Sequence, residues 1–107
     1  MSRFTSHDVM AALQELAAAH PARVGEARYR DDDGAFACID GAILVRLGIS
    51  QAELNNRCVF SQAPRRVRSR FTAKAAKLMA RLQSLNDKGY RWGQMPELAR
   101  RFLKHGW

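Results

Sequence analysis

The apolar residues near the start of the chain repeat at the spacing of one helix face. Either Thr5 or Ser6 can cap the first turn, and Asp8 follows where a negative charge favours the positive end of the helix dipole. Pro21 interrupts the pattern and sets its end. The sequence therefore predicts an amphipathic helix between these signals, with an apolar stripe formed by Val9, Leu13, Leu16 and Ala17.

A longer stretch in the second half of the chain shows the same helical spacing. It begins at Ser69 or Thr72 and runs to Asn86, and Gly89 just beyond it is the usual residue type for a left-handed helix end. This is the longest helix that the pattern predicts. The residues expected to face the core are Phe71, Ala75, Leu78, Leu82 and Leu85.

The segment after Gly89 divides into a loop, YRWGQM, and a final helix, PELARRFLKH. Pro96 suits a first helical position, because its missing N–H would have no intrahelical partner there. Trp92 in the loop is expected to fill the gap between the last two helices. The residues of the final helix expected to point inward are Leu98, Phe102 and Leu103.

Two shorter helices are predicted in the middle of the chain. Asp40 can cap the segment GAILVRL, and Gly48 ends it. Ser50 and Glu53 have the spacing of a capping box, so a second short helix is expected to begin there. Upstream, β-compatible stretches flank an Asp-Asp-Asp-Gly turn, which allows a short β-hairpin near residues 27–38.

Together these elements predict a mainly α fold. We expect one small domain over residues 1–107, with about five helices and the short hairpin as an optional addition. The chain has 107 residues and is 47% hydrophobic, which is the balance of an ordinary globular domain that can bury a core. The predicted core residues are Leu13, Leu16, Phe36, Ile43, Leu47, Leu78, Leu82, Trp92 and Phe102.

Charge is divided unevenly along the chain, whose formal net charge is +8. Residues 1–57 carry a net charge of −2. Residues 58–107 carry twelve Lys or Arg against Asp87 and Glu97, a net charge of +10. A cationic half of this kind favours polyanions or acidic protein surfaces as partners.

Seven basic residues lie between positions 65 and 81, and no carboxylate occurs from residue 55 to residue 86. At about 100° per residue, Arg70, Lys74, Lys77, Arg81 and Lys88 fall within a helical sector of about 60°. Such a row can follow phosphates, although a solvated helix face is the alternative. We therefore expect nucleic acid, with DNA favoured, to bind at Arg65, Arg66, Arg68, Arg70, Lys74, Lys77 and Arg81.

The segment DGAILVRLGISQAELNNR, residues 40–57, resembles a helix-turn-helix. Gln51 and Asn55 would then reach base edges, where both side-chain types can pair with adenine. Leu44 stands where such motifs want a small residue, and Arg57 where they want an apolar one. Two short helices joined by an ordinary glycine turn are the alternative interpretation. In either case the packing positions are Ile43, Leu47, Ile49 and Leu54.

Two short motifs give a second resemblance that covers more of the chain. The stretches FACIDGAILVRLGI and LMARLQSLNDKGYRWGQMPEL resemble small uncharacterised proteins of actinobacteria and their phages. These proteins pair a Cys-x-x-Gly-Ala helix start with a later Asn-Asp-x-Gly…Trp segment. The resemblance implies a bacterial or phage setting and no particular activity. The matching residues are Cys38, Gly41, Ala42, Asn86, Asp87, Gly89 and Trp92.

The remaining polar residues indicate a binding protein and not an enzyme. The three histidines are scattered, and the chain has neither a Cys-x-x-Cys or His-x-x-x-His spacing nor a glycine-rich phosphate loop. We therefore predict no catalytic residue, no metal and no cofactor, and interpret the aspartates at 31–33 as a turn. The side chains of Asn86 and Asp87 are expected to form hydrogen bonds with the backbone at the end of their own helix.

Two functional classes stay open on the sequence alone. The first is a small basic nucleic-acid-binding accessory or regulatory protein. The alternative is an interaction module that binds an acidic surface of a host protein, using the same basic residues with Tyr90 or Trp107. A homodimer would suit the first class without being required by it.

The cysteines and the N-terminus bear on location. Cys38 and Cys58 are far apart and are expected to be small buried hydrophobes in a reducing compartment. The first residues form neither a signal peptide nor a membrane span. We therefore expect a cytoplasmic protein without a membrane partner, in the bacterial host cytoplasm if it is phage-encoded.

Overall fold

The computed structural model describes residues 3–24, 38–54 and 59–106, and most of them lie in helices. The mainly α prediction is confirmed, whereas the predicted hairpin near residues 27–38 falls outside the described residues except for Cys38. Over the described ranges the helices are α1 (Ser6–Ala19), α2 (Ile39–Arg46), α3 (Arg65–Arg68), α4 (Ala73–Asp87) and α5 (Met95–His105), with 3-10 turns η1 (Phe60–Gln62) and η2 (Trp92–Gln94).

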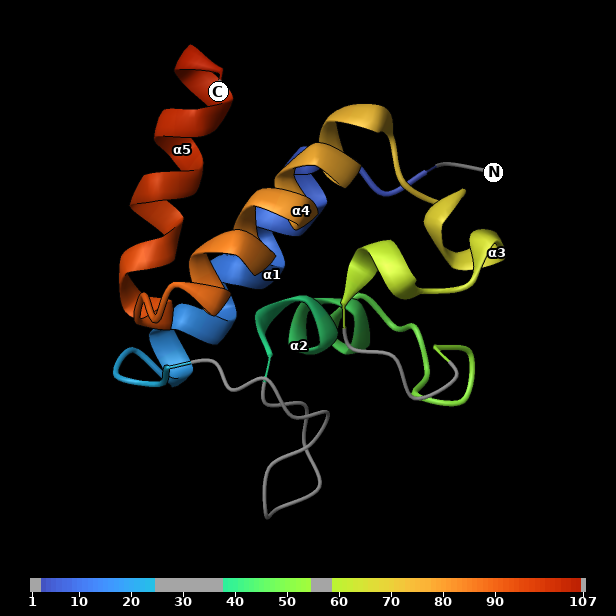
Figure 1. Cartoon of the computed structure of the whole chain (residues 1–107), viewed down its shortest axis with the longest axis horizontal. Coiled ribbons are helices and arrows are strands. Elements are labelled where there is room, and N and C mark those ends of the chain that lie inside the picture. The colour runs from blue at the N-terminus through green and yellow to red at the C-terminus, as the bar shows by residue number, and fades with distance from the viewer. Residues whose placement is uncertain (1–2, 25–37, 55–58, 107) are drawn as a thin grey trace.

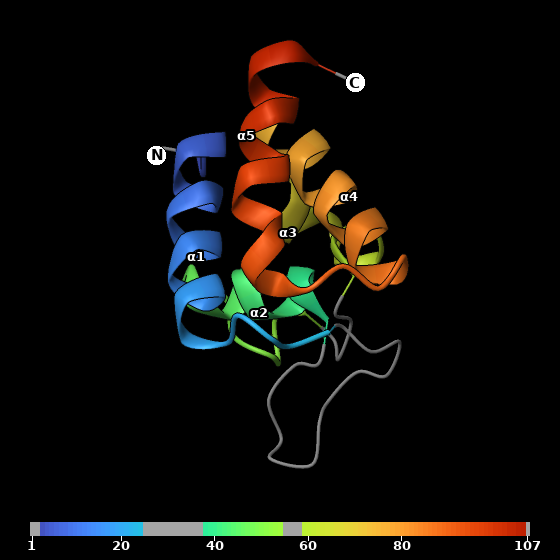
Figure 2. The same ribbon diagram turned by 90° about the vertical axis from the view of Figure 1, so that its left-hand side faces the viewer.

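Three long helices pack against one another and form the frame of the molecule. Helices α1 and α4 run in the same direction, and α5 returns in the opposite one (Figure 1). Each of the three contacts the other two, and Figure 2 shows them standing side by side. The shorter α2 packs against α1 and α4, while η1 packs against α4.

The start of α1 follows the predicted capping signal, with Thr5 as the N-cap. The backbone N–H of Asp8 donates to Thr5 Oγ1 over 3.3 Å, and the N–H of Thr5 donates to Asp8 Oδ2 over 2.8 Å. This reciprocal pair satisfies two backbone donors that have no intrahelical acceptor. Val9, Leu13 and Ala17 of the predicted stripe are buried.

Helix α4 begins after Thr72, whose Oγ1 accepts a hydrogen bond from the N–H of Ala75 over 3.2 Å. Gly89 follows its end with φ of 87°, so the predicted glycine stop is confirmed. The prediction that places Arg70 on this helix is wrong. The backbone there pairs with Phe4 instead: the Phe4 N–H donates to Arg70 O over 2.7 Å, and the Thr72 N–H donates to Phe4 O over 2.9 Å.

Helix α2 is capped differently from the sequence expectation. The N-cap residue is Cys38, and Asp40 lies inside the first turn, fully buried. Asp40 Oδ2 accepts a hydrogen bond from the N–H of Phe60 over 3.1 Å, so this carboxylate holds η1 against α2. Gly48, with φ of 93°, ends the helix region as predicted.

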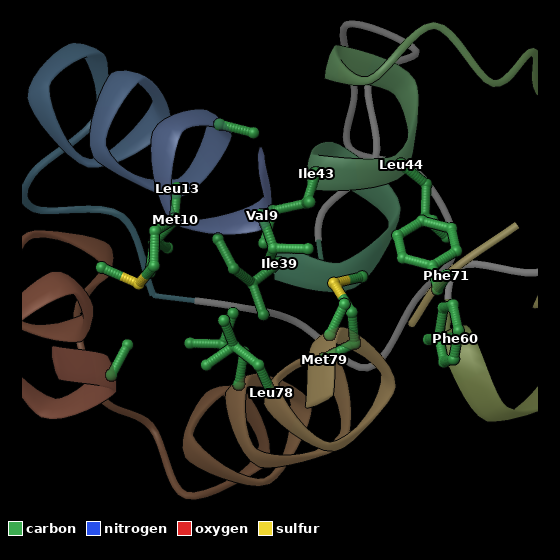
Figure 3. Packing of buried hydrophobic residues seen from close by; sticks show 14 of the residues in the cluster. Val9, Met10, Leu13, Ile39, Ile43, Leu44, Phe60, Phe71, Leu78 and Met79 are labelled. Carbon is green, nitrogen blue, oxygen red and sulfur yellow. The ribbon is translucent and has the colours of Figure 1, made fainter. Parts of the chain in front are cut away.

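The core lies where α1, α2 and α4 meet, with Phe60 and Phe71 at one side (Figure 3). Most predicted core residues are buried, but Leu16 and Leu47 are only partly buried and Phe36 lies outside the described residues. In α5 the inward residues are Met95, Ala99 and Phe102. The expectation that Leu98 and Leu103 point inward is therefore only partly correct, because they flank that central row on opposite sides and are half-buried.

Candidate nucleic-acid interface

The seven predicted basic residues do not form one continuous row. Pro64 is followed by the four-residue helix α3, which is folded around the buried side chain of Val67. Helix α4 is a separate element and carries the other predicted cations. The first group comprises Arg65, Arg66, Arg68 and Arg70, and the second comprises Lys74, Lys77 and Arg81.

Three arginines of the first group bind within the protein. Arg70 forms an ion pair with Glu53, with 2.9 Å between Nη2 and Oε1. Arg66 Nη2 lies 3.5 Å from the backbone carbonyl oxygen of Glu53, and Arg68 Nε donates to Ala63 O over 3.0 Å. These contacts hold α3 and the preceding loop in place. Part of the predicted cationic surface is therefore used within the protein.

The Glu53 carboxylate holds both the turn that begins at Ser50 and the arginine that follows α3. Its Oε2 accepts the N–H of Ser50 over 3.0 Å, and its own N–H donates to Ser50 Oγ over 3.1 Å, so the predicted capping box is present. The hydrogen bond from the Ser50 backbone, followed by that from Arg70, lowers the pKa of Glu53 below its ordinary value.

Helix α4 presents its basic residues on one exposed side. Lys74, Lys77, Arg81 and Lys88 are all exposed, and on a regular helix they fall within a sector of about 60° beside the core-facing row. Asp87 is the one carboxylate in this helix, and it accepts a hydrogen bond from Gln83 Nε2 over 2.9 Å. We call the side formed by these four cations the α4 face.

A groove between α4 and α5 borders the α4 face. Its volume is about 400 Å³. Leu85, Leu98 and Phe102 give it an apolar base, Arg81 lines it from α4, and Arg101 and His105 line it from α5. Tyr90 is also part of the lining and is 38% exposed.

Arg101 is a basic residue of this groove that the sequence reasoning did not select. It pairs with Glu97 one turn earlier, at 3.2 Å. The i,i+4 spacing of these two residues is typical of an exposed helix face. The position of that face beside α4, however, depends on how the two helices pack. The groove is therefore a result of the tertiary arrangement.

Of the two predicted base-contacting residues, only Gln51 lies within the described residues, and it does not line the groove beside the α4 face. The prediction of a second short helix beginning at Ser50 is wrong for the described residues, because residues 51–54 form a turn; Asn55 and Arg57 lie outside the described residues. Gln51 lines a different depression, together with Trp92 and the end of α1. Ile43, Ile49 and Leu54 are buried as predicted, which agrees with either interpretation of this segment.

The Asn-Asp pair near the end of α4 has a different role from the predicted one. Asn86 Oδ1 accepts a hydrogen bond from the N–H of Ile39 over 3.1 Å, which joins the end of α4 to the start of α2. The Asp87 carboxylate accepts a hydrogen bond from the Gln83 side chain instead of bonding to the backbone at the helix end. Trp92 is buried as predicted and contacts the end of α1, since its ring lies edge-on to His20 at 6.0 Å between centroids.

The described residues also bear on three other kinds of site. They contain no group of three or more His, Cys, Asp or Glu side chains placed to hold a metal ion, and the aspartates at 31–33 lie outside this part of the chain. None of the described helices is long and apolar enough to cross a membrane. Cys38 is buried as predicted, and Cys58 is outside the described residues.

Comparisons with known protein families, curated proteins and solved structures find no match to this chain. Any functional conclusion therefore depends on the chemistry of the chain itself.

Proposed function

We propose that this protein binds nucleic acid, with DNA favoured, through the α4 face. It would act as a small accessory or regulatory protein in a bacterial or phage setting, working in the cytoplasm by binding and not by catalysis. The observation that carries the proposal is the row of four exposed cations, Lys74, Lys77, Arg81 and Lys88, of which the first three lie in a stretch, residues 55–86, that contains no carboxylate.

The length of the row suits a phosphate backbone. Lys74 and Lys88 are fourteen positions apart, which on an α-helix is a distance of about 20 Å. One DNA strand carries a phosphate about every 3.4 Å along the axis, so the row extends over about six of them. Each contact releases condensed counterions, which makes such binding strongly dependent on salt.

The groove beside α4 adds an aromatic contact to this electrostatic one. Tyr90 is exposed next to Arg81 and Arg101, and bases can stack on an exposed aromatic ring whatever their sequence. This arrangement supports binding of unpaired as well as paired strands. Base-specific contacts by Gln51 and Asn55 stay a prediction, since Gln51 is not part of the α4 face and Asn55 lies outside the described residues.

A fluorescence-anisotropy titration tests the proposal directly. Labelled random duplex and single-stranded DNA, with matching RNA, would be titrated at about 50 and about 200 mM salt. With about four phosphate contacts, the affinity should fall about 100-fold between the two conditions. If no nucleic acid binds at micromolar protein in the lower salt, the proposal is wrong.

The alternative partner is an acidic surface on a host protein. It is favoured by three exposed large apolar side chains, Val24, Val45 and Tyr90, since apolar and arginine anchors also suit protein interfaces. A pull-down from nuclease-treated bacterial lysate separates the two proposals. A protein partner that survives nuclease and is lost from Lys74→Glu/Lys77→Glu would favour the alternative, provided that purified nucleic acid fails to bind.

A further inference from the structure

The cation row of the α4 face ends next to an exposed aromatic side chain. Lys88 is the last cation of the row, and Tyr90, which is 38% exposed, follows two residues later. Gly89 between them has φ of 87°, a left-handed backbone conformation that favours glycine. The chain therefore turns directly from the last cation to the aromatic ring.

The backbone of this turn is held by the end of helix α4. The Gly89 N–H donates to Asn86 O over 3.1 Å, and the Tyr90 N–H donates to Leu85 O over 3.2 Å. Both acceptors are carbonyl groups of the last helical turn, which have no intrahelical donor. The fold therefore fixes the backbone of Tyr90 beside the groove between α4 and α5.

This groove has the room and the apolar surface for one planar ring. Its volume of about 400 Å³ lies within the range of sites that hold small organic molecules. Leu85 and Leu98 contribute apolar surface to its lining, and Tyr90 contributes the exposed ring. Every nucleobase has a π-face that can stack on an aromatic side chain. An unpaired base can therefore stack on Tyr90 inside the groove.

The charges around the groove suit the phosphates of the strand that carries such a base. No carboxylate is among the described residues that line it. Glu97 pairs with Arg101 beside it, but both side chains are 69% exposed, and an exposed pair of this kind contributes little to stability. Arg101 can therefore exchange Glu97 for a phosphate oxygen, which would add a cation from α5 to those of the α4 face.

We propose that the preferred partner is a single strand of nucleic acid, with one unpaired base in the groove and its phosphates along the α4 face. This inference rests on the proposed function and adds the form of the strand. Lys88 would contact a phosphate next to the base that stacks on Tyr90. In a duplex each base is paired and stacked, so it would have to leave the double helix to reach the ring.

The test compares three labelled ligands by fluorescence anisotropy at about 50 mM salt. They are a dT strand of about twelve nucleotides, an abasic strand of the same length and a random duplex of the same length, all longer than the row of cations. The abasic strand has the same phosphates without bases, so it isolates the base contact. The wild type should bind dT at least about fivefold more tightly than the abasic strand, and more tightly than the duplex, because one base stacks on the ring.

Variants at Tyr90 locate the base contact. Tyr90→Leu keeps an apolar side chain but removes the ring, so its affinity for dT should fall to about that for the abasic strand. The salt dependence of dT binding should stay the same, because no charge is lost. Tyr90→Phe keeps the ring and should retain the difference between the two strands. Val45→Ala is the control at an exposed apolar side chain outside the groove lining, and urea unfolding checks that each variant is folded.

Three results would overturn this inference and leave the proposed function standing. They are equal affinities of the wild type for dT and the abasic strand, a duplex that binds as tightly as dT, and a Tyr90→Leu protein that prefers dT as strongly as the wild type does. Failure of all three ligands to bind at micromolar protein would overturn both proposals together.

Discussion

Glu53 forms an ion pair within the protein and so reduces the number of basic side chains that could bind a partner. It lies two residues after Gln51 in sequence, accepts a hydrogen bond from Ser50 and pairs with Arg70. The sequence pattern identified its capping role through the Ser50 spacing. The ion pair with Arg70 joins positions 17 residues apart, so no local pattern could predict it.

Glu53→Gln tests this arrangement through pH. Glutamine can still complete a capping box, so the substitution removes mainly the charge. The folded pKa of Glu53 is lowered, so its stabilising effect is present above the ordinary value of 4.5 and is lost as pH falls through the folded pKa. We expect the wild type to be more stable than Glu53→Gln at pH 7 and the difference to be smaller at about pH 3.

Urea unfolding at both pH values provides the measurement. Glu97→Gln is a control from an exposed ion pair on α5, and it should change the free energy of unfolding by no more than about 0.5 kcal/mol. A difference between wild type and Glu53→Gln that grows on acidification would contradict the assignment.

Asn86 is the residue whose role sequence reasoning placed wrongly. A side-chain amide near a helix end commonly bonds to the local backbone, but here its acceptor is used by Ile39, 47 residues away. Asn86→Ala would leave that buried N–H without its partner. We expect a loss of about 1–3 kcal/mol in the free energy of unfolding, measured in urea.

Ser84→Ala on the same helix is the control, and it should change the free energy of unfolding by less than about 0.5 kcal/mol. Similar stability of Asn86→Ala and this control would show that the α2–α4 hydrogen bond contributes little.

At the scale of elements, local capping signals were the most reliable guide. Thr5, Thr72, Gly48 and Gly89 begin or end structure where the sequence predicts it. Helix α3 was not foreseen, because four residues after a proline give no periodicity to detect. The η2 turn was predicted as a loop for the same reason.

Gly93→Ala tests how η2 is held against the end of α1. The new methyl group would lie 2.8 Å from the Pro21 carbonyl oxygen, so the backbone of one segment must move. Overpacking of this kind should lower the free energy of unfolding by about 1–3 kcal/mol. Thermal and urea unfolding measure it, with exposed Arg91→Ala as the control.

A Gly93→Ala protein as stable as the Arg91→Ala control would mean that this contact relaxes without cost.

At the scale of the whole molecule, the sequence predicts a basic half but not how its charges are distributed over the surface. Arg66, Arg68 and Arg70 bind carbonyl groups or Glu53, whereas Lys74 and Lys77 are exposed on α4. The groove between α4 and α5 then brings Arg101 and Tyr90 beside Arg81 of the same face. These differences favour the α4 face over α3 as the proposed binding surface.

Nucleic-acid binding through the α4 face predicts different effects for two pairs of charge-removing substitutions. Lys74→Ala/Lys77→Ala removes two charges from the α4 face. Arg3→Ala/Arg100→Ala removes two exposed charges from the start of the chain and from the side of α5 that does not line the groove. Both variants should remain folded, since exposed substitutions of this kind change stability by about 0.5 kcal/mol or less.

The most direct measurement is the slope of log affinity against log salt concentration for wild type and both variants, obtained by anisotropy on one random duplex. The slope should become shallower by about 1.8 for Lys74→Ala/Lys77→Ala, because two phosphate contacts are lost at about 0.9 each, and should change little for Arg3→Ala/Arg100→Ala. Equal changes in slope for the two variants, or no change in either, would contradict binding through the α4 face.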